Sequence, residues 1–172
     1  MDNSIILTAL HWQPMRKCLC VINITTAFKC SIQMAVFCVL GGSCGNVNGQ
    51  FQYPRCISVF NGEVFVTDRD NHRIQVFSLD GQFLRTWGSQ GSDVGQFKSP
   101  WGIAVSAGGE VFVCDDGNHR IQMFSVEGMF LHTYGSSGKG DGQFCNPSGV
   151  VVSAGGEVFV CDYGRSCVQV FG

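Results

Sequence analysis

The sequence predicts an all-β protein built from about three copies of one unit of short antiparallel strands. Two observations support this prediction. Gly-Gln-Phe occurs at Gly49–Phe51, Gly95–Phe97 and Gly142–Phe144, and the stretch Ser106–Asp115 recurs unchanged as Ser153–Asp162. The repeat is about 47 residues long, and a unit of that size made of short strands buries its faces only by stacking against its neighbours.

In the second unit, four runs of strand length are separated by segments rich in Gly, Asp, Asn and Ser, which favour turns. The first run is continuously apolar, the second and third alternate, and the fourth ends in an aromatic residue followed by Gly; they lie at 102–105, 110–114, 120–124 and 130–134. Pro54, Pro100 and Pro147 are expected just before the first strand of each unit, where the missing N–H costs no ladder hydrogen bond. Four antiparallel strands per repeat are typical of a β-propeller blade.

Residues 1–35 differ in character from the repeats and are expected to be a poorly ordered or mispredicted leader. They contain no continuous run of about 20 apolar residues that could span a bilayer. They also lack the order of a secretory signal, so a cytoplasmic location is expected. The repeat array is assigned to residues 36–172, with units at about 49–94, 95–141 and 142–172 and a preceding fourth strand at 37–42.

The predicted strands add up to about three blades, whereas propellers typically have four to eight. The fold is therefore expected to be a partial β-propeller with an open ring. Such a chain is expected either to form a homodimer that closes a six-bladed ring or to be part of a longer array, and the longer array is preferred.

Two segments resemble the signature of NHL repeats. Asp68–Phe77 is D-R-D-N-H-R-I-Q-V-F and Asp115–Phe124 is D-D-G-N-H-R-I-Q-M-F, and each follows a Gly-Gln-Phe tripeptide. The resemblance covers residues 37–172 and implies an NHL-type propeller. The chain departs from the pattern at Cys56, which replaces a glycine, and at Arg165–Cys167, which replaces Asn-His-Arg.

The residue types of this motif indicate a structural role. An Asp that opens the turn after a strand can accept backbone N–H bonds, and the following Asn tolerates the left-handed conformation. The Arg can form paired hydrogen bonds to an Asp of the same or the adjacent blade. The residues assigned to the structural blade motif are Asp68, Asn71, His72, Arg73, Asp115, Asn118, His119, Arg120 and Asp162.

The loops between the second and third strands and those leading into each blade are expected on one face. Arginine and aromatic residues on a rigid frame favour partner recognition. The residues predicted to bind a partner there are Arg55, Arg69, Trp101, Tyr163 and Arg165. For Trp101 and Tyr163, capping of the inner strands remains an equal alternative.

The resemblance implies a non-catalytic scaffold that binds protein partners, with a possible role in substrate recognition for ubiquitin ligation, although no RING cysteine pattern is present. A single-stranded RNA-binding module is the alternative. Residues 49–172 carry a net charge of −4, which disfavours phosphate binding. The acidic residues in or beside the predicted loops are Asp68, Asp70, Asp93, Asp115, Asp116, Asp141 and Asp162.

No catalytic residue, metal site or cofactor is predicted. His72 and His119 recur at one position of the repeat, so blade geometry explains them, and the Asp115–Asp116 pair is expected to be solvated. The ten cysteines form no Cys-x-x-Cys pair and are expected to be free thiols. A metal-dependent lyase-like enzyme is a distant third possibility.

Overall fold

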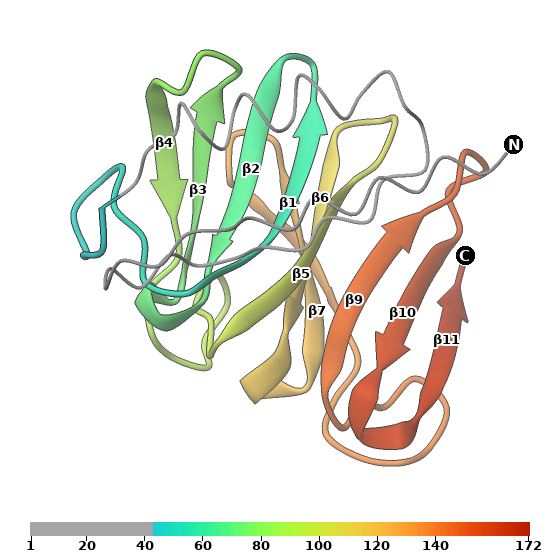
Figure 1. Cartoon of the computed structure of the whole chain (residues 1–172). Coiled ribbons are helices and arrows are strands. Elements are labelled where there is room, and N and C mark those ends of the chain that lie inside the picture. Colours follow the sequence, from blue (N-terminus) through green and yellow to red (C-terminus); the bar gives the residue numbers. More distant parts are fainter. Residues whose placement is uncertain (1–42) are drawn as a thin grey trace, which may run out of the picture.

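The computed structural model describes residues 43–172, which form eleven β-strands and three single-turn 3-10 helices arranged in three antiparallel sheets (Figure 1). The leader expected at 1–35 and the strand expected at 37–42 lie outside the described residues. No helix of the described part is long and apolar enough to cross a membrane. The prediction of an all-β fold made of stacked four-stranded units is confirmed, with the third sheet holding three strands.

Each sheet, here called a blade, is a meander in which strands pair in chain order. The first blade consists of β1 (Pro54–Phe60), β2 (Glu63–Asp68), η1 (Arg69–Asn71), β3 (Arg73–Ser78) and β4 (Phe83–Trp87). The second consists of β5 (Pro100–Val105), β6 (Glu110–Asp115), η2 (Asp116–Asn118), β7 (Arg120–Ser125) and β8 (Phe130–Tyr134). The third consists of β9 (Pro147–Val152), β10 (Val158–Asp162), η3 (Tyr163–Arg165) and β11 (Cys167–Phe171).

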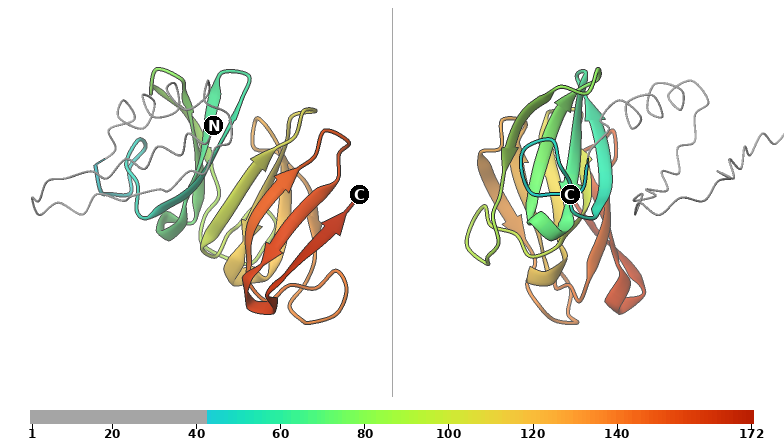
Figure 2. Two further views of the ribbon diagram at one scale, coloured as in Figure 1. Left: turned by 45° about the vertical axis from the view of Figure 1, so that its right-hand side comes forward. Right: turned by 60° about the vertical axis from the view of Figure 1, so that its left-hand side comes forward.

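The three blades follow one another like the leaves of a fan, with β1, β5 and β9 side by side along the inner rim (Figures 1 and 2). Two apolar clusters lie between neighbouring blades because successive residues of a strand point to opposite faces. In β6, Val111 and Val113 belong to the cluster shared with the first blade, whereas Phe112 and Cys114 belong to the cluster shared with the third. The middle blade is therefore covered on both faces.

The three prolines are the first residues of β1, β5 and β9, rather than the residues before these strands as predicted. Each pairs with the buried Asp that ends the second strand, as Pro54 does with Asp68 and Pro100 with Asp115. A register shift directly after each proline absorbs its missing N–H.

The aromatic-Gly pair that ends a fourth strand has a packing reason. Gly135 adopts a left-handed φ of 86°, and a Cβ atom there would lie 2.4 Å from ring carbons of Phe144. Gly88 stands in the same relation to Phe97, and both phenylalanines are fully buried. Phe97 and Phe144 therefore fill the joints between neighbouring blades, and Gly88 and Gly135 make room for them.

Candidate interaction surface

One end of the fan collects the three 3-10 turns and the segments that lead into β1, β5 and β9. The backbone N–H of Asp70 donates to the carbonyl of Gln52 at 3.0 Å, and Gly117 makes the equivalent bond to Lys98. In the third blade Tyr163 donates to Asn146, with donor and acceptor each shifted by one residue. This end is called the loop face below and lies at the bottom of Figure 1. The two sets of loops share one face in the structure, as the sequence predicts.

A buried carboxylate anchors each part of the loop face. Asp68 is fully buried, and its Oδ1 accepts the N–H of Gln52 at 2.7 Å. Its Oδ2 accepts bonds from Asn71 Nδ2 at 2.8 Å, Arg73 Nε at 2.8 Å and Gln75 Nε2 at 3.1 Å. Asp115 repeats this arrangement with Asn118, Arg120 and Gln122. Four donors per carboxylate compensate the loss of its hydration.

The arginines bond differently from the paired bonds that the sequence suggests. Arg73 gives its carboxylate partner one bond, and its Nη atoms donate to the carbonyls of Asn46, Val47 and Gln50. The partner Asp belongs to the same blade. Arg73 and Arg120 therefore tie the first and second blades to the connectors before them, and the apolar clusters join blade to blade.

The left-handed residue of the turn is not the asparagine. The positive φ falls on His72, His119 and Ser166, at 53°, 56° and 52°. The asparagine stays within the 3-10 turn, where its side chain bonds to the buried Asp. The left-handed conformation expected at Asn71 and Asn118 is therefore found one residue later. Each asparagine instead donates a side-chain hydrogen bond to the buried Asp.

Both histidines form joints between blades. His72 Nδ1 accepts the N–H of Ser99 at 3.1 Å, and His119 Nδ1 donates to the carbonyl of Cys145. Ser99 and Cys145 lead into the next blade in each case. Within residues 43–172 no group of three or more His, Cys, Asp or Glu side chains is placed to hold a metal ion. The six described cysteines are free thiols.

A glutamine of the third strand has a role that the sequence analysis missed. Gln75 is fully buried; its Oε1 accepts the N–H of Gly49 at 2.9 Å, and its Nε2 donates to the carbonyl of Gln50 at 2.7 Å. Gln122 and Gln169 hold their own Gly-Gln-Phe segments in the same way. The signal was present, because a Gln recurs at this position in all three units.

In the third blade a different arginine binds the connector that precedes the blade. Asp162 accepts the N–H groups of Cys145 and Asn146, but Cys167 stands where the other blades have the paired Arg. Arg165, two residues earlier, donates through Nη1 to the carbonyls of Gly140 and Gln143 at 2.9 and 3.1 Å. It was predicted to bind a partner, and the structure places its guanidinium on the backbone of its own blade.

Three of the predicted partner-binding residues come together across the joint between the first two blades. Arg55 of β1 and Trp101 of β5 occupy the same position of neighbouring inner strands, and the Arg55 guanidinium carbon lies 4.2 Å from the Trp101 ring centroid. The guanidinium of Arg69, at the start of η1, lies 5.5 Å from the same centroid and pairs with Asp70 at 3.0 Å. Arg55, Arg69 and Trp101 are called the Arg–Trp cluster below.

The Trp101 backbone is held by the first blade, because its carbonyl accepts a hydrogen bond from the Thr67 hydroxyl of β2 at 2.8 Å. Cation–π contacts of this kind contribute about 0.5–1 kcal/mol at exposed sites. Arg55 is exposed, while Arg69 and Trp101 are half-buried. The Nε atom of Arg69 is buried and has no hydrogen-bond partner among the described residues. The cluster is thus a preorganised cationic and aromatic surface.

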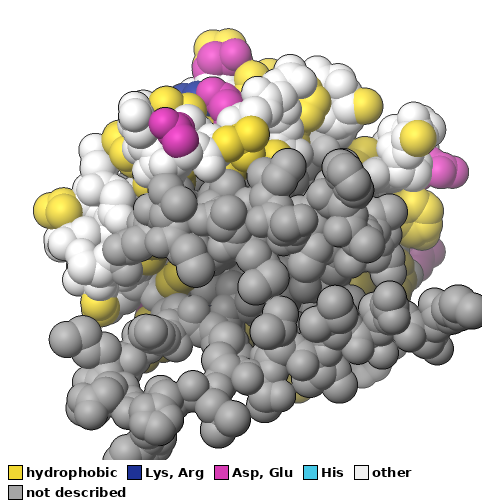
Figure 3. All heavy atoms as spheres, turned by 45° about the horizontal axis from the view of Figure 1, so that its top comes forward, with side chains coloured by type: hydrophobic (Ala, Val, Ile, Leu, Met, Phe, Trp, Pro, Cys, Tyr) yellow, Lys and Arg dark blue, Asp and Glu magenta, His cyan; other side chains and the backbone are white. Residues whose placement is uncertain are grey.

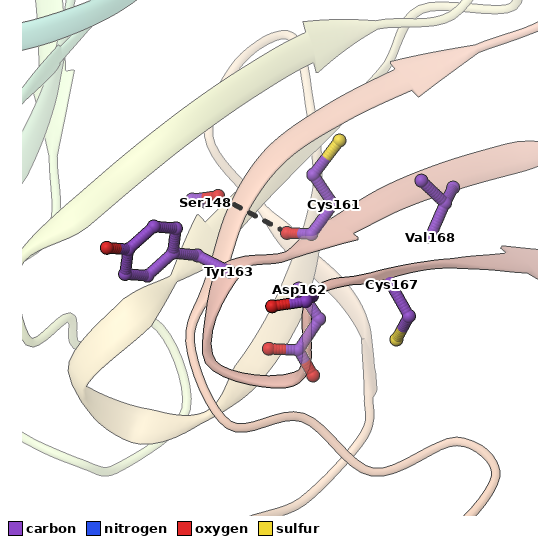
Figure 4. A pocket seen from close by; sticks show the side chains of 7 residues that line it. Ser148, Cys161, Asp162, Tyr163, Cys167 and Val168 are labelled. Atoms are coloured by element: carbon purple, nitrogen blue, oxygen red, sulfur yellow. Dashed lines mark hydrogen bonds between the residues drawn. The ribbon is translucent and has the colours of Figure 1, made fainter.

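Tyr163 lies apart from this cluster, on the third blade. Its side chain is 81% exposed, and it borders a shallow hollow of about 380 Å³ with Ser148, Asp162 and Val168. In Figure 4 its ring points away from Cys167 and Val168. Tyr163 does not cap an inner strand, which removes that alternative for this residue.

The loop face is less acidic than its sequence indicates. Asp68, Asp115 and Asp162 are at most 1% exposed and serve the turns beneath the surface. Asp70 is paired with Arg69. Asp93, Asp116 and Asp141 remain as carboxylates that are not fully buried. At the opposite end of the fan, the visible Asp and Glu side chains are scattered among apolar and neutral ones (Figure 3).

Comparison with known proteins identifies the repeat. The sequence model of the family described as NHL repeat matches residues 51–77, 97–124 and 144–171, one match in each blade. The chain belongs to the NHL-repeat family. Each match runs from the phenylalanine of Gly-Gln-Phe to the end of the third strand, so the segment that recurs in this family is the one that surrounds the buried Asp.

A curated relative is the RING finger protein nhl-1 of Caenorhabditis elegans, which is 39% identical over 66 residues. That match covers 38% of this chain and 7% of the relative, so the chain spans a small part of its length.

Similar solved structures include a nidogen/laminin complex, which matches with a TM-score of 0.55 at 22% identity. The match covers 73% of this chain and 45% of that chain. A streptogramin B lyase has a TM-score of 0.52 at 16% identity, with 69% and 40% covered. At these identities the likeness shows the propeller-type fold alone.

Proposed function

We propose that this NHL-repeat chain is a non-catalytic scaffold that binds protein partners through its loop face, with the Arg–Trp cluster at the centre of the contact. The observation that carries the proposal is the placement of two guanidinium groups within 6 Å of one tryptophan ring, on the rim where two blades meet. Tryptophan and arginine are the residue types that contribute most to protein interfaces.

The cluster favours a partner segment that carries carboxylates. Arg55 presents donors in a fork that matches a carboxylate, and the Trp101 ring beneath it limits the conformational freedom that binding must remove. Stacking on Trp101 also holds Arg55 on the rim, where a partner can reach it.

A role in substrate recognition for ubiquitin ligation belongs to this proposal and is supported by the likeness to a RING finger protein. The chain itself supplies the binding surface in this view. A cytoplasmic location goes with the proposal and is tested by imaging the tagged chain.

The test compares proteins captured from nuclease-treated cell extract by the wild-type chain and by three variants. Trp101→Ala and Arg55→Glu each remove or reverse one half of the cluster, and a shared set of partners should be lost from both. Val94→Ala, at a 63% exposed connector residue, is the matched control and should retain that set. Capture that is identical for all four proteins would overturn the assignment of the cluster.

Single-stranded RNA binding is the second candidate. The burial of three loop aspartates supports it, because it leaves less negative charge on the loop face than the sequence indicates. A fluorescent U-rich oligonucleotide separates the two candidates. Binding that weakens steeply with salt and is lost in Arg55→Glu supports RNA, because each phosphate contact releases counterions. A metal-dependent lyase has the least support, and metal analysis of the purified chain tests it.

A further inference from the structure

One carboxylate, that of Asp70, borders the Arg–Trp cluster. Nη1 of Arg69 donates to Oδ1 of Asp70 at 3.0 Å, and the two side chains are 29% and 30% exposed. The pair lies where the first two blades meet, because the Arg69 guanidinium is 5.5 Å from the centroid of the Trp101 ring. Ion pairs with this degree of exposure contribute little to stability. Another carboxylate can therefore compete with Asp70 for the arginine.

The turn of the first blade does not require a side chain at position 70. The second and third blades have Gly117 and Gly164 at this position of the repeat. The N–H of Gly117 donates to the carbonyl of Lys98 as the N–H of Asp70 donates to that of Gln52. Since glycine makes the same turn with the same backbone bond, the carboxylate of Asp70 has no part in forming it.

The first blade also departs from the other two in having room for this side chain. A Cβ atom on Gly117 would lie 2.7 Å from Cγ of Lys98, and one on Gly164 would lie 2.6 Å from Cβ of Cys145. The position of Arg69 likewise differs, because the other blades have Asp116 and Tyr163 there. Among the three blades, the Arg–Asp pair occurs only in the one whose turn borders the Trp101 ring.

The contact with Asp70 leaves Arg69 with donor capacity. A guanidinium carries five N–H donors in a fork that can bind a carboxylate through two parallel bonds. Arg69 gives one bond to Asp70, and its buried Nε has no hydrogen-bond partner among the described residues. Because an unpaired buried donor is costly, this arrangement favours an exchange in which Arg69 takes a better-placed acceptor.

We propose that Asp70 is an internal competitor that a carboxylate of an acidic peptide segment displaces from Arg69. This inference rests on the proposed function, because it concerns the partner segment assigned to the Arg–Trp cluster. In the complex, a glutamate or aspartate of the partner takes the place of Asp70 at Arg69, while Arg55 on the Trp101 ring contacts the same segment. Asp70 lowers the affinity by competing for the arginine and by repelling the bound carboxylate.

Fluorescence anisotropy of a fluorescein-labelled decaglutamate peptide, with the full chain in about 50 mM salt, tests the proposal. Asp70→Asn should bind the peptide about fivefold more tightly than wild type, because the competitor is removed. Asp93→Asn is the matched control, since it removes an exposed carboxylate from the segment that leads into β5, and it should change the affinity less than about twofold. The Tm of Asp70→Asn should stay within about 2 °C of wild type.

A double-mutant cycle with Arg69→Gln isolates the competition. In the Arg69→Gln background, Asp70→Asn should change the affinity less than about twofold, because the competitor no longer has an arginine to occupy. A fivefold gain that persists in that background would refute the competition and assign the gain to net charge.

Two further outcomes separate this inference from the proposed function. Peptide binding that is lost in Trp101→Ala and Arg55→Glu, but is the same in Asp70→Asn and Asp93→Asn, would refute the competitor and leave the proposed function standing. If Asp70→Asn binds no decaglutamate, or if it gains affinity only for the U-rich oligonucleotide, the carboxylate partner is refuted. The capture experiment then decides the proposed function independently of Asp70.

Discussion

Asp115 and Arg120 form a partly buried ion pair across one turn, with Nε and Oδ2 2.8 Å apart and the Asp side chain fully buried. The pair recurs as Asp68 and Arg73, and the third blade lacks it because Cys167 replaces the arginine. In the first and second blades, the turn between the second and third strands therefore depends on an arginine that compensates a buried carboxylate.

Removing the arginine of the pair should destabilise the chain strongly. We expect Arg120→Ala to lower the free energy of unfolding by about 3 kcal/mol, because it leaves a buried carboxylate without its cation. Arg165→Ala, which removes only two bonds to backbone carbonyls, should cost about 1 kcal/mol. Urea unfolding followed by circular dichroism measures both, and equal losses would contradict the special role of the pair.

A glycine on the inner rim should tolerate no side chain. A Cβ atom on Gly102 would lie 2.8 Å from the carbonyl oxygen of Ser148 and 3.0 Å from the Cα of Gly149. We expect Gly102→Ala to cost about 1–3 kcal/mol through this clash between β5 and β9. Gly149 holds the same repeat position and its Cβ would meet only Cys161 at 3.6 Å, so Gly149→Ala should change stability by less than about 0.5 kcal/mol.

Two cysteines at one repeat position should differ in reactivity. Burial raises the pKa of the Cys114 thiol well above its usual value, so this thiol stays protonated and unreactive at neutral pH. Cys161 is exposed. Iodoacetamide should alkylate Cys161 about a hundredfold faster than Cys114, as read by peptide mass spectrometry. Similar rates in the folded chain would mean that the third blade does not cover the second.

The outer strand of the first blade carries an ion pair that should respond to acid. Arg85 donates to both carboxylate oxygens of Glu63 at 2.8 and 2.5 Å and also to the carbonyl of Val126 in the next blade. The hydrogen bond from Arg85 is the main reason that the pKa of Glu63 lies below its usual value of 4.5, and burial opposes it. The stabilisation is therefore present above about pH 4.5 and is lost as the pH falls through the lower folded-state pKa.

We expect Glu63→Gln to lower the Tm at pH 7, and we expect its difference from wild type to shrink as the pH falls through the lowered pKa of Glu63. Thermal unfolding by circular dichroism at pH 7, 5 and 3 provides the measurement. Glu157→Gln is the control, because Glu157 holds the same repeat position and accepts a hydrogen bond from the Ser153 hydroxyl, and this change should alter the Tm little. A difference in Tm between Glu63→Gln and wild type that is as large at pH 3 as at pH 7 would contradict the assignment.

Most of the fold follows from repetition in the sequence. The four runs of the second unit agree with β5–β8 to within about two residues, because strand alternation and Gly-rich turns are local signals. The 3-10 turns and the left-handed His72 and His119 were missed, since the carboxylate network that selects them joins residues distant in the chain. Gln75 and Gln122 are buried, although they are the polar residues of an alternating strand.

The sequence by itself determined that this protein is an array of antiparallel blades, because every unit repeats the residues of its turns and core. Only the tertiary structure decided which loop residues remain for a partner. It turned Asp68, Asp115, Asp162 and Arg165 inward onto backbone groups and brought Arg55, Arg69 and Trp101 together from separate strands and turns. The physical reason is that hydrogen-bond satisfaction and stacking depend on distances between segments, and these are set only when one blade packs on the next.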